Sequence, residues 1–165
     1  AVGAAFGTGA RVLVGAQATR EALRSGAGEA DVVHLACHAQ FRADSPMFSA
    51  LELADGALAL HEAPQLGLRA QLVTLSACET GLSRIAPGNE AIGLVRGFLM
   101  SGVRTGVASS WAVDDAATAT LMRGFYRRLV GGEPCAEALA GAQRESARGG
   151  AHPFHWAAFA PHGRG

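Results

Sequence analysis

Short runs of β-forming residues alternate with longer segments of helical periodicity, and no other feature constrains the fold of this chain as strongly. The β-type runs predict strands at residues 11–15, 31–36, 71–77, 105–111 and 154–160, the last of them at an edge. Strands that alternate with helices are typical of a mostly parallel sheet covered by helices. The sequence therefore predicts an α/β fold, a three-layer α/β/α sandwich.

Apolar residues at helical spacing indicate two of the connecting helices, one with Ile92, Val95, Phe98 and Leu99 and one with Leu121, Met122, Phe125, Tyr126 and Leu129. Either Asp114 or Asp115 caps the second of these helices, and Pro134 opens a further one. Nearer the amino terminus, Thr19 is a typical N-cap. These signals place at least one helix between each pair of successive predicted strands, except between the strands at 31–36 and 71–77, where a hairpin is predicted instead.

Turn chemistry predicts one hairpin. Residues 48–60 alternate apolar and polar side chains around Asp55-Gly56, a pair that favours a tight two-residue connection. We expect this hairpin to be a surface excursion from the main sheet.

The composition supports one folded domain. The 165 residues are 49% hydrophobic and 17% charged, which is enough to bury a core. Fourteen acidic residues balance fourteen basic ones, so the basic excess typical of a nucleic-acid binder is missing. With no apolar run of about 18 residues we expect no membrane span, and with no positively charged segment ahead of an apolar stretch we expect no secretory signal. Three Cys do not make a disulfide framework, which indicates free thiols in a reducing, cytoplasmic compartment.

Two reactive side chains stand directly after predicted buried strands. His38 follows the strand at 31–36, and Cys78 follows the strand at 71–77. Ligands of open α/β sheets bind outside the carboxyl ends of the strands, so neighbouring strands would bring both side chains to one cleft. A Cys beside a His is the minimum set for thiol nucleophilic catalysis, and backbone N–H groups in the adjoining turns could bind an oxyanion.

Cysteine also has a plainer interpretation, because it is among the most buried residue types and often ends a strand for packing alone. Cys37 points to the opposite face of its strand from His38, so we expect it in the core. Cys135, at the start of a helix, is expected to be structural.

The sequence supports a zinc site or a nucleotide-binding fold less well than the Cys–His site. His34 and His38 would lie roughly 13 Å apart on a strand, and no CxxC or HExxH motif accompanies His152 and His155, so a zinc site is disfavoured. A nucleotide-binding fold is disfavoured because the Gly-rich residues 7–9 precede the first strand instead of following it. We expect no metal and no cofactor.

Two segments resemble the signature motifs of CHAT domains, His34-Leu35-Ala36-Cys37-His38-Ala39 and Leu75-Ser76-Ala77-Cys78-Glu79-Thr80-Gly81. Further segments are similar to the carboxyl-terminal half of the family, at residues 109–115, 125–126, 138–143 and 152–159. The resemblance covers residues 11–163. CHAT domains are caspase-like cysteine peptidase domains of bacteria, often fused to tetratricopeptide repeats.

The resemblance implies a caspase-like sheet and a role for each motif. It implies that His38 is the general base, that Cys78 is the nucleophile, and that the backbone N–H groups of Ala39 and Cys78 form the oxyanion hole. The substrate would be a protein or peptide, and a repeat domain in a longer chain could regulate the site. A catalytically idle caspase-like module for protein interaction or signalling remains the alternative.

Two adjacent carboxylates offer a binding site for a basic substrate residue. One Asp suffices to cap the helix that starts near Ala116, which leaves the other free to pair with an Arg side chain. The related separases and gingipains prefer basic residues before the scissile bond, and we favour Asp115 over Asp114 for this role.

The resemblance also carries an expectation about the amino terminus. The resemblance implies that CHAT domains are longer than this chain and have a strand and a helix ahead of the segment that starts here at Ala1. We therefore expect residues 1–165 to form a single CHAT-like domain that lacks its N-terminal part and self-associates when isolated.

Overall fold

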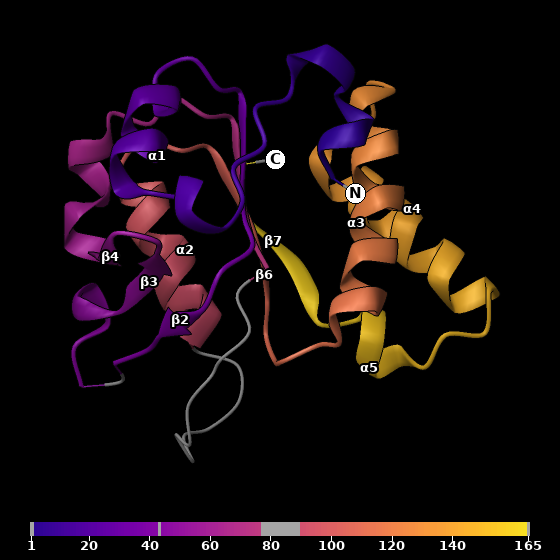
Figure 1. The fold of residues 1–165 in the computed structure, drawn as a ribbon. Coiled ribbons are helices and arrows are strands. Elements are labelled where there is room, and N and C mark those ends of the chain that lie inside the picture. Colours follow the sequence, from indigo (N-terminus) through magenta and orange to yellow (C-terminus); the bar gives the residue numbers. More distant parts are fainter. Residues whose placement is uncertain (1, 43, 77–89, 165) are drawn as a thin grey trace.

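A central sheet with helices on both faces organises the computed structural model of the chain, which describes residues 2–42, 44–76 and 90–164 (Figure 1). Within these residues the main sheet has the order β1-β5-β6-β7. Its strands are β1 (Val32–Leu35), β5 (Leu72–Leu75), β6 (Thr105–Ser109) and β7 (Phe159–Gly163). The first three are parallel and β7 is antiparallel, so the predicted mostly parallel sheet is confirmed.

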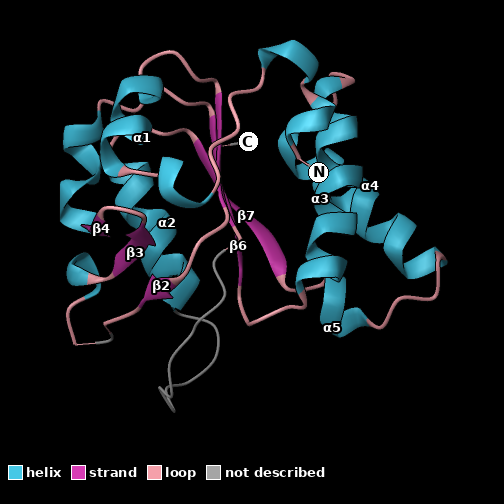
Figure 2. Ribbon diagram, in the orientation of Figure 1, coloured by secondary structure: helices cyan, strands magenta, loops and turns pink. Residues whose placement is uncertain are grey.

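Helices form the two outer layers. They are α1 (Arg20–Ala27), α2 (Glu90–Met100), α3 (Asp115–Val130), α4 (Cys135–Arg148) and α5 (Pro153–Trp156). Figure 2 shows α1 and α2 on one side of the sheet and the other three helices on the opposite side, which confirms the three-layer α/β/α sandwich. None of the helices in the described part of the chain is long and apolar enough to cross a membrane.

Each layer has its own apolar core, because successive strand residues face opposite sides of the sheet. Val73 and Leu75 of β5 pack with α2 residues such as Phe98, while Leu72 packs with Phe125 of α3. The approach of α2 to β6 is close, because a Cβ atom on Gly106 would clash with Cγ1 of Val95. The two cores pack the sheet between the helical layers.

A smaller antiparallel sheet continues from the carboxyl end of β1. It contains β2 (Ala39–Gln40), β3 (Ala50–Leu53) and β4 (Gly56–Ala59), in that order. The predicted hairpin is therefore confirmed. The expectation of a surface excursion was wrong, because Leu51 and Leu58 are almost completely buried in the core shared with α1 and α2. Alternation along β3 and β4 turns one face of the hairpin inward.

The hairpin turn is fastened to the start of α1. Thr19 caps this helix as predicted, since its Oγ1 accepts the N–H of Ala22 at 3.1 Å. A second cap comes from the turn, where Oδ1 of Asp55 accepts the N–H of Arg20 at 2.9 Å. The N–H of Ala54 donates to the carbonyl of Ala18 at 2.9 Å. The small sheet is thereby tied to the helical layer.

The prediction of a strand at residues 11–15 was wrong. The backbone is extended at Ala10 and Val14, yet the segment pairs with none of the strands in the described residues. Val12 and Val14 are 61% and 70% exposed, and a 3₁₀ turn starts at Gly15 with φ of 57°. β-forming side chains make a strand only where a neighbouring strand supplies the ladder.

The last strand begins later than predicted, at Phe159 instead of Phe154. Pro153 starts α5, with Nδ1 of His152 accepting the N–H of Phe154 at 3.2 Å. Proline suits the first helical position because its fixed φ is helical and no N–H is needed there. Strand pairing then begins at Phe159, and β7 lies at an edge of the sheet as predicted.

Candidate functional site

The carboxyl ends of three parallel strands meet at one edge of the main sheet. Leu35 of β1 pairs with Leu75 of β5, which in turn pairs with Ala108 of β6. The alignment continues one residue past β5, because the N–H of Ser76 donates to the carbonyl of Leu35 at 2.9 Å. β1 and β5 are therefore neighbours, as the Cys–His prediction required, and β6 lies beside β5.

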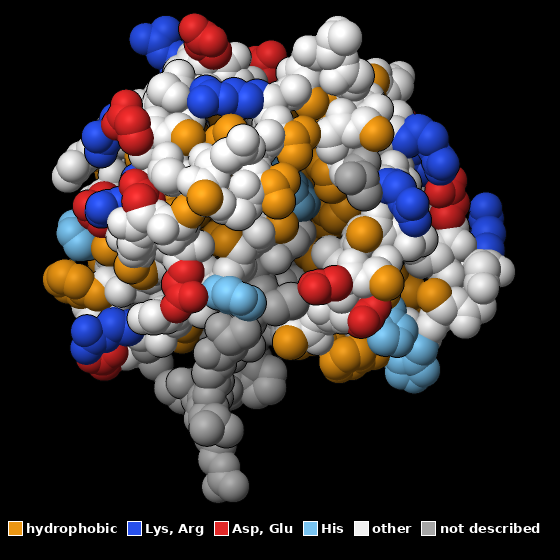
Figure 3. Space-filling model, in the orientation of Figure 1, with side chains coloured by type: hydrophobic (Ala, Val, Ile, Leu, Met, Phe, Trp, Pro, Cys, Tyr) orange, Lys and Arg blue, Asp and Glu red, His pale blue; other side chains and the backbone are white. Residues whose placement is uncertain are grey.

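His38 lies where the main sheet passes into the small one. Its side chain is exposed, and within the described residues it has no hydrogen-bond partner. Its carbonyl accepts the N–H of Glu52 of β3 at 2.8 Å. In Figure 3 a histidine and acidic side chains lie at the surface on the side of the molecule where the strands end. The backbone at His38 is thus fixed while the imidazole remains accessible.

Ala39 presents its N–H to the side away from β3. It pairs with Leu51, and the bond from Glu52 to the carbonyl of His38 makes this the non-hydrogen-bonded kind of antiparallel pair. The N–H groups of such a pair point away from the partner strand. No described residue other than glycine has a positive φ, so Ala39 has an ordinary backbone for a residue with a side chain.

Cys78 lies outside the described residues, and so does its backbone N–H. The other two cysteines are half-buried. Burial is the main cause that raises the pKa of Cys37 to about 11, and the carboxylate of Glu52 contributes to the same shift. Burial also raises the pKa of Cys135. Both thiols are therefore protonated and unreactive near neutral pH. Cys37 and Cys135 pack against the two cores, as predicted.

The two adjacent aspartates have different surroundings. Oδ1 of Asp114 accepts the N–H groups of Ala116 and Ala117 at 3.0 and 2.9 Å, so Asp114 is the N-cap of α3. Asp115 is the first residue of α3 and its side chain is exposed. Both residues follow β6, whose carboxyl end lies next to that of β5. Capping therefore accounts for Asp114 and leaves the carboxylate of Asp115 available.

His34 is half-buried against α3. Its Nδ1 lies 2.9 Å from the hydroxyl of Tyr126, and the two rings are edge to face at 5.6 Å. Burial lowers the pKa of His34 to about 4 and raises the pKa of Tyr126. His34 faces α3 and is thereby separated from the exposed His38. In the described ranges no group of three or more His, Cys, Asp or Glu could hold a metal ion.

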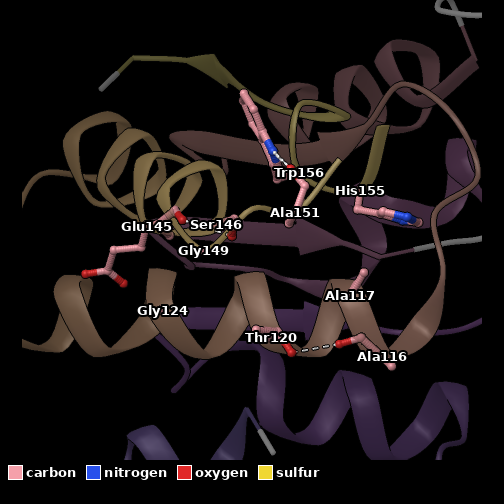
Figure 4. A pocket seen from close by; sticks show the side chains of 11 residues that line it. Ala116, Ala117, Thr120, Gly124, Glu145, Ser146, Gly149, Ala151, His155 and Trp156 are labelled. Atoms are coloured by element: carbon pink, nitrogen blue, oxygen red, sulfur yellow. Dashed lines mark hydrogen bonds between the residues drawn. The ribbon is translucent and has the colours of Figure 1, made fainter. Parts of the chain in front are cut away.

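A separate hollow of about 500 Å³ lies between α3, α4 and α5 (Figure 4). Small residues line most of it, and its hydroxyls are already bonded: Thr120 donates to the carbonyl of Ala116, and Ser146 donates to that of Ala142. None of the residues predicted for the site lines this hollow. It is distinct from the strand ends.

Sequence reasoning missed the neighbourhood of Glu52. This half-buried carboxylate lies opposite His38 and accepts a hydrogen bond from Nε2 of Gln40 at 2.7 Å. The only signal in the sequence is the alternation of residues 48–60, which predicts the pairing of β3 with β4 but not that of β2 with β3. A strand as short as β2 has no detectable period.

Comparison with known proteins gives two findings. A family model described as the CHAT domain matches residues 1–164. Tetratricopeptide repeat protein 28 of mouse, and the human protein of the same name, are each 25% identical over 191 aligned positions. The alignments cover 92% of this chain and 8% of each relative, so the chain spans less than a tenth of their length.

Proposed function

Because this chain belongs to the CHAT domain family, a caspase-like family, we propose that it is a cysteine endopeptidase domain that cleaves a protein partner. The observation that carries the proposal is the parallel register of β1 and β5. It sets the strand that leads to His38 beside the strand that leads, three residues beyond Leu75, to Cys78. The motif positions of the family coincide with these two strand ends.

The proposed reaction is acyl transfer. His38 takes the proton of the Cys78 thiol, and the thiolate attacks the scissile carbonyl. As the C–N bond breaks, His38 gives the proton to the leaving amine, and the acyl group remains on Cys78 as a thioester. Water then hydrolyses the thioester, returning the thiol and releasing the new carboxyl terminus. No metal or cofactor takes part in the proposed steps.

Backbone donors at the same strand ends complete the proposal. The oxyanion would be bound by the N–H groups of Ala39 and Cys78. The direction of the Ala39 N–H, away from β3, supports this role, since it is not used in the ladder of the small sheet. A preorganised donor of this kind lowers the barrier without any rearrangement during the reaction.

An idle caspase-like interaction module is the competing proposal, and alkylation of the thiols separates the two. An activated Cys78 should react with iodoacetamide at least about tenfold faster than the two half-buried cysteines, because the thiolate is the reactive form. This advantage should be lost in His38→Ala and kept in His61→Ala, which removes another exposed histidine. Slow and equal labelling of all three thiols, measured by mass spectrometry of peptides, would favour the idle module.

Substrate preference is the finer part of the proposal. We propose that Asp115 pairs with a basic residue before the scissile bond, because Asp114 is occupied as the N-cap. Since the side chain of Asp115 is exposed, the preference should be modest, about tenfold for Arg over Leu. Peptide reporters with Arg, Leu or Asp at that position measure it as kcat/KM.

Asp115→Asn should remove this preference and leave the melting temperature unchanged. Asp114→Ala is the matched control: it should keep the preference and lose about 1 kcal/mol of stability with the cap. A wild-type chain that prefers Leu or Asp would end the assignment.

The proposed setting follows from the relatives. The mouse and human relatives are named for tetratricopeptide repeats, and we propose that a repeat domain in a longer chain presents or restrains the substrate of this domain. A thiol nucleophile works in a reducing compartment, so the proposal includes a cytoplasmic location.

A further inference from the structure

A carboxylate stands opposite His38 across the small sheet. Ala39 pairs with Leu51 and Gln40 with Ala50, so one step earlier His38 faces Glu52, whose N–H donates to the carbonyl of His38. Residues directly opposite each other in an antiparallel pair project to the same face, with Cβ atoms about 4.5–5.5 Å apart. The lengths of the two side chains then bring an imidazole nitrogen within reach of the carboxylate by rotation about side-chain bonds.

A side-chain hydrogen bond identifies the face on which Glu52 lies. Nε2 of Gln40 donates to Oε1 of Glu52 at 2.7 Å, so these two side chains share one side of the small sheet. Gln40 is two residues beyond His38, and side chains two apart on an extended chain point the same way. The imidazole and the carboxylate are therefore on the same face, with Gln40 holding one carboxylate oxygen.

The charge of Glu52 is not neutralised by a salt bridge to any described Arg or His side chain. The Glu52 side chain is half-buried, and its negative charge raises the pKa of the Cys37 thiol, which lies just beyond the carboxyl end of β1. Other carboxylates of the hairpin are already engaged: Asp55 with Arg20, and Glu62 with the N–H of Ala59 at 2.9 Å. Glu52 differs from both, because among the described residues its carboxylate is bonded only by the side-chain amide of Gln40, on the face that it shares with His38.

We infer that Glu52 is a positioning residue for His38. Its carboxylate accepts one imidazole N–H, which fixes the ring and its tautomer and leaves the other ring nitrogen to receive the thiol proton. When His38 becomes charged in the reaction, the carboxylate also stabilises the imidazolium. This inference rests on the proposed peptidase function, and it turns the Cys–His dyad into a triad in which Glu52 orients the base.

Glu52→Gln tests the inference because it removes the charge and keeps the shape and the acceptor for Gln40. We expect kcat on a peptide reporter to fall about tenfold or more while KM stays within about twofold, the pattern of an interaction made only in the transition state. Glu52→Asp should recover part of the loss. Glu62→Gln is the control, since it removes a carboxylate of the same region whose bond is purely structural. Equal kcat values for Glu52→Gln and Glu62→Gln would overturn the inference.

A second measurement separates this inference from the peptidase proposal. Long-range nitrogen–proton NMR reports the tautomer of the His38 ring without any substrate. One dominant tautomer is expected in the wild-type chain, and a mixture is expected in Glu52→Gln. If the wild-type chain cleaves nothing but the tautomer changes, the peptidase proposal fails and the positioning role stands. If the tautomer is the same in both chains, the positioning role is wrong, whatever the cleavage assay shows.

Discussion

Cys78→Ala is expected to reduce peptide-bond cleavage by roughly a thousandfold or more, because without the thiol no acyl-enzyme can form. The remaining side chains of the proposed site cannot replace a nucleophile. The measurement compares wild type and variant on candidate protein partners under single-turnover conditions, with the melting temperature recorded for both. We expect the two melting temperatures to agree closely.

The chain contains its own controls for this experiment. Cys37→Ala and Cys135→Ala remove thiols whose pKa values are raised by burial, so both variants should keep full cleavage. A Cys78→Ala chain that retained even a tenth of the wild-type activity would falsify the assignment of the nucleophile.

Acid is expected to destabilise the fold through His34. Burial lowers the pKa of this imidazole from 6.5 to about 4, so protonation favours the unfolded chain. The contribution of neutral His34 to stability is complete above pH 6.5 and is lost as the pH falls from 6.5 towards about 4. At about 1.4 kcal/mol per pH unit, this difference corresponds to about 3 kcal/mol in the free energy of unfolding.

The comparison that isolates this effect is with His34→Gln, which does not titrate and keeps an acceptor for the hydroxyl of Tyr126. Between about pH 7 and about pH 4.5, wild type should lose about 2 kcal/mol more than the variant in urea unfolding. Carboxylates titrate in both chains and cancel in the difference. Parallel pH dependences for the two chains would show that His34 is not the acid-sensitive group.

Much of the architecture could be predicted because the signals involved are local. The runs at 31–36 and 71–77 are apolar enough to indicate buried strands. Thr19 and Asp114 indicate helix starts, because their side-chain oxygens can accept the free N–H groups of a first helical turn. The strand ends then follow, since parallel strands bring their carboxyl ends to one edge. His38, Ala39 and the aspartates of α3 were located in this way.

The remaining features depend on contacts between distant residues. Val12 and Val14 have the side chains of a strand but no partner in the described sheet, and propensity alone cannot reveal that. The pairing of β2 with β3 depends on two residues of β2, too few for a periodic pattern. Glu52 was overlooked for this reason, although it lies directly opposite the predicted base.

The register of the small sheet has a practical consequence for engineering. A tight surface hairpin is normally a safe place for an inserted tag or loop. Here a single residue added at the start of β3, ahead of Leu51, would exchange the inward and outward faces of the residues that follow it, since side chains alternate along a strand. Leu51 would leave the core and Glu52 would turn away from His38, even though neither residue had been replaced.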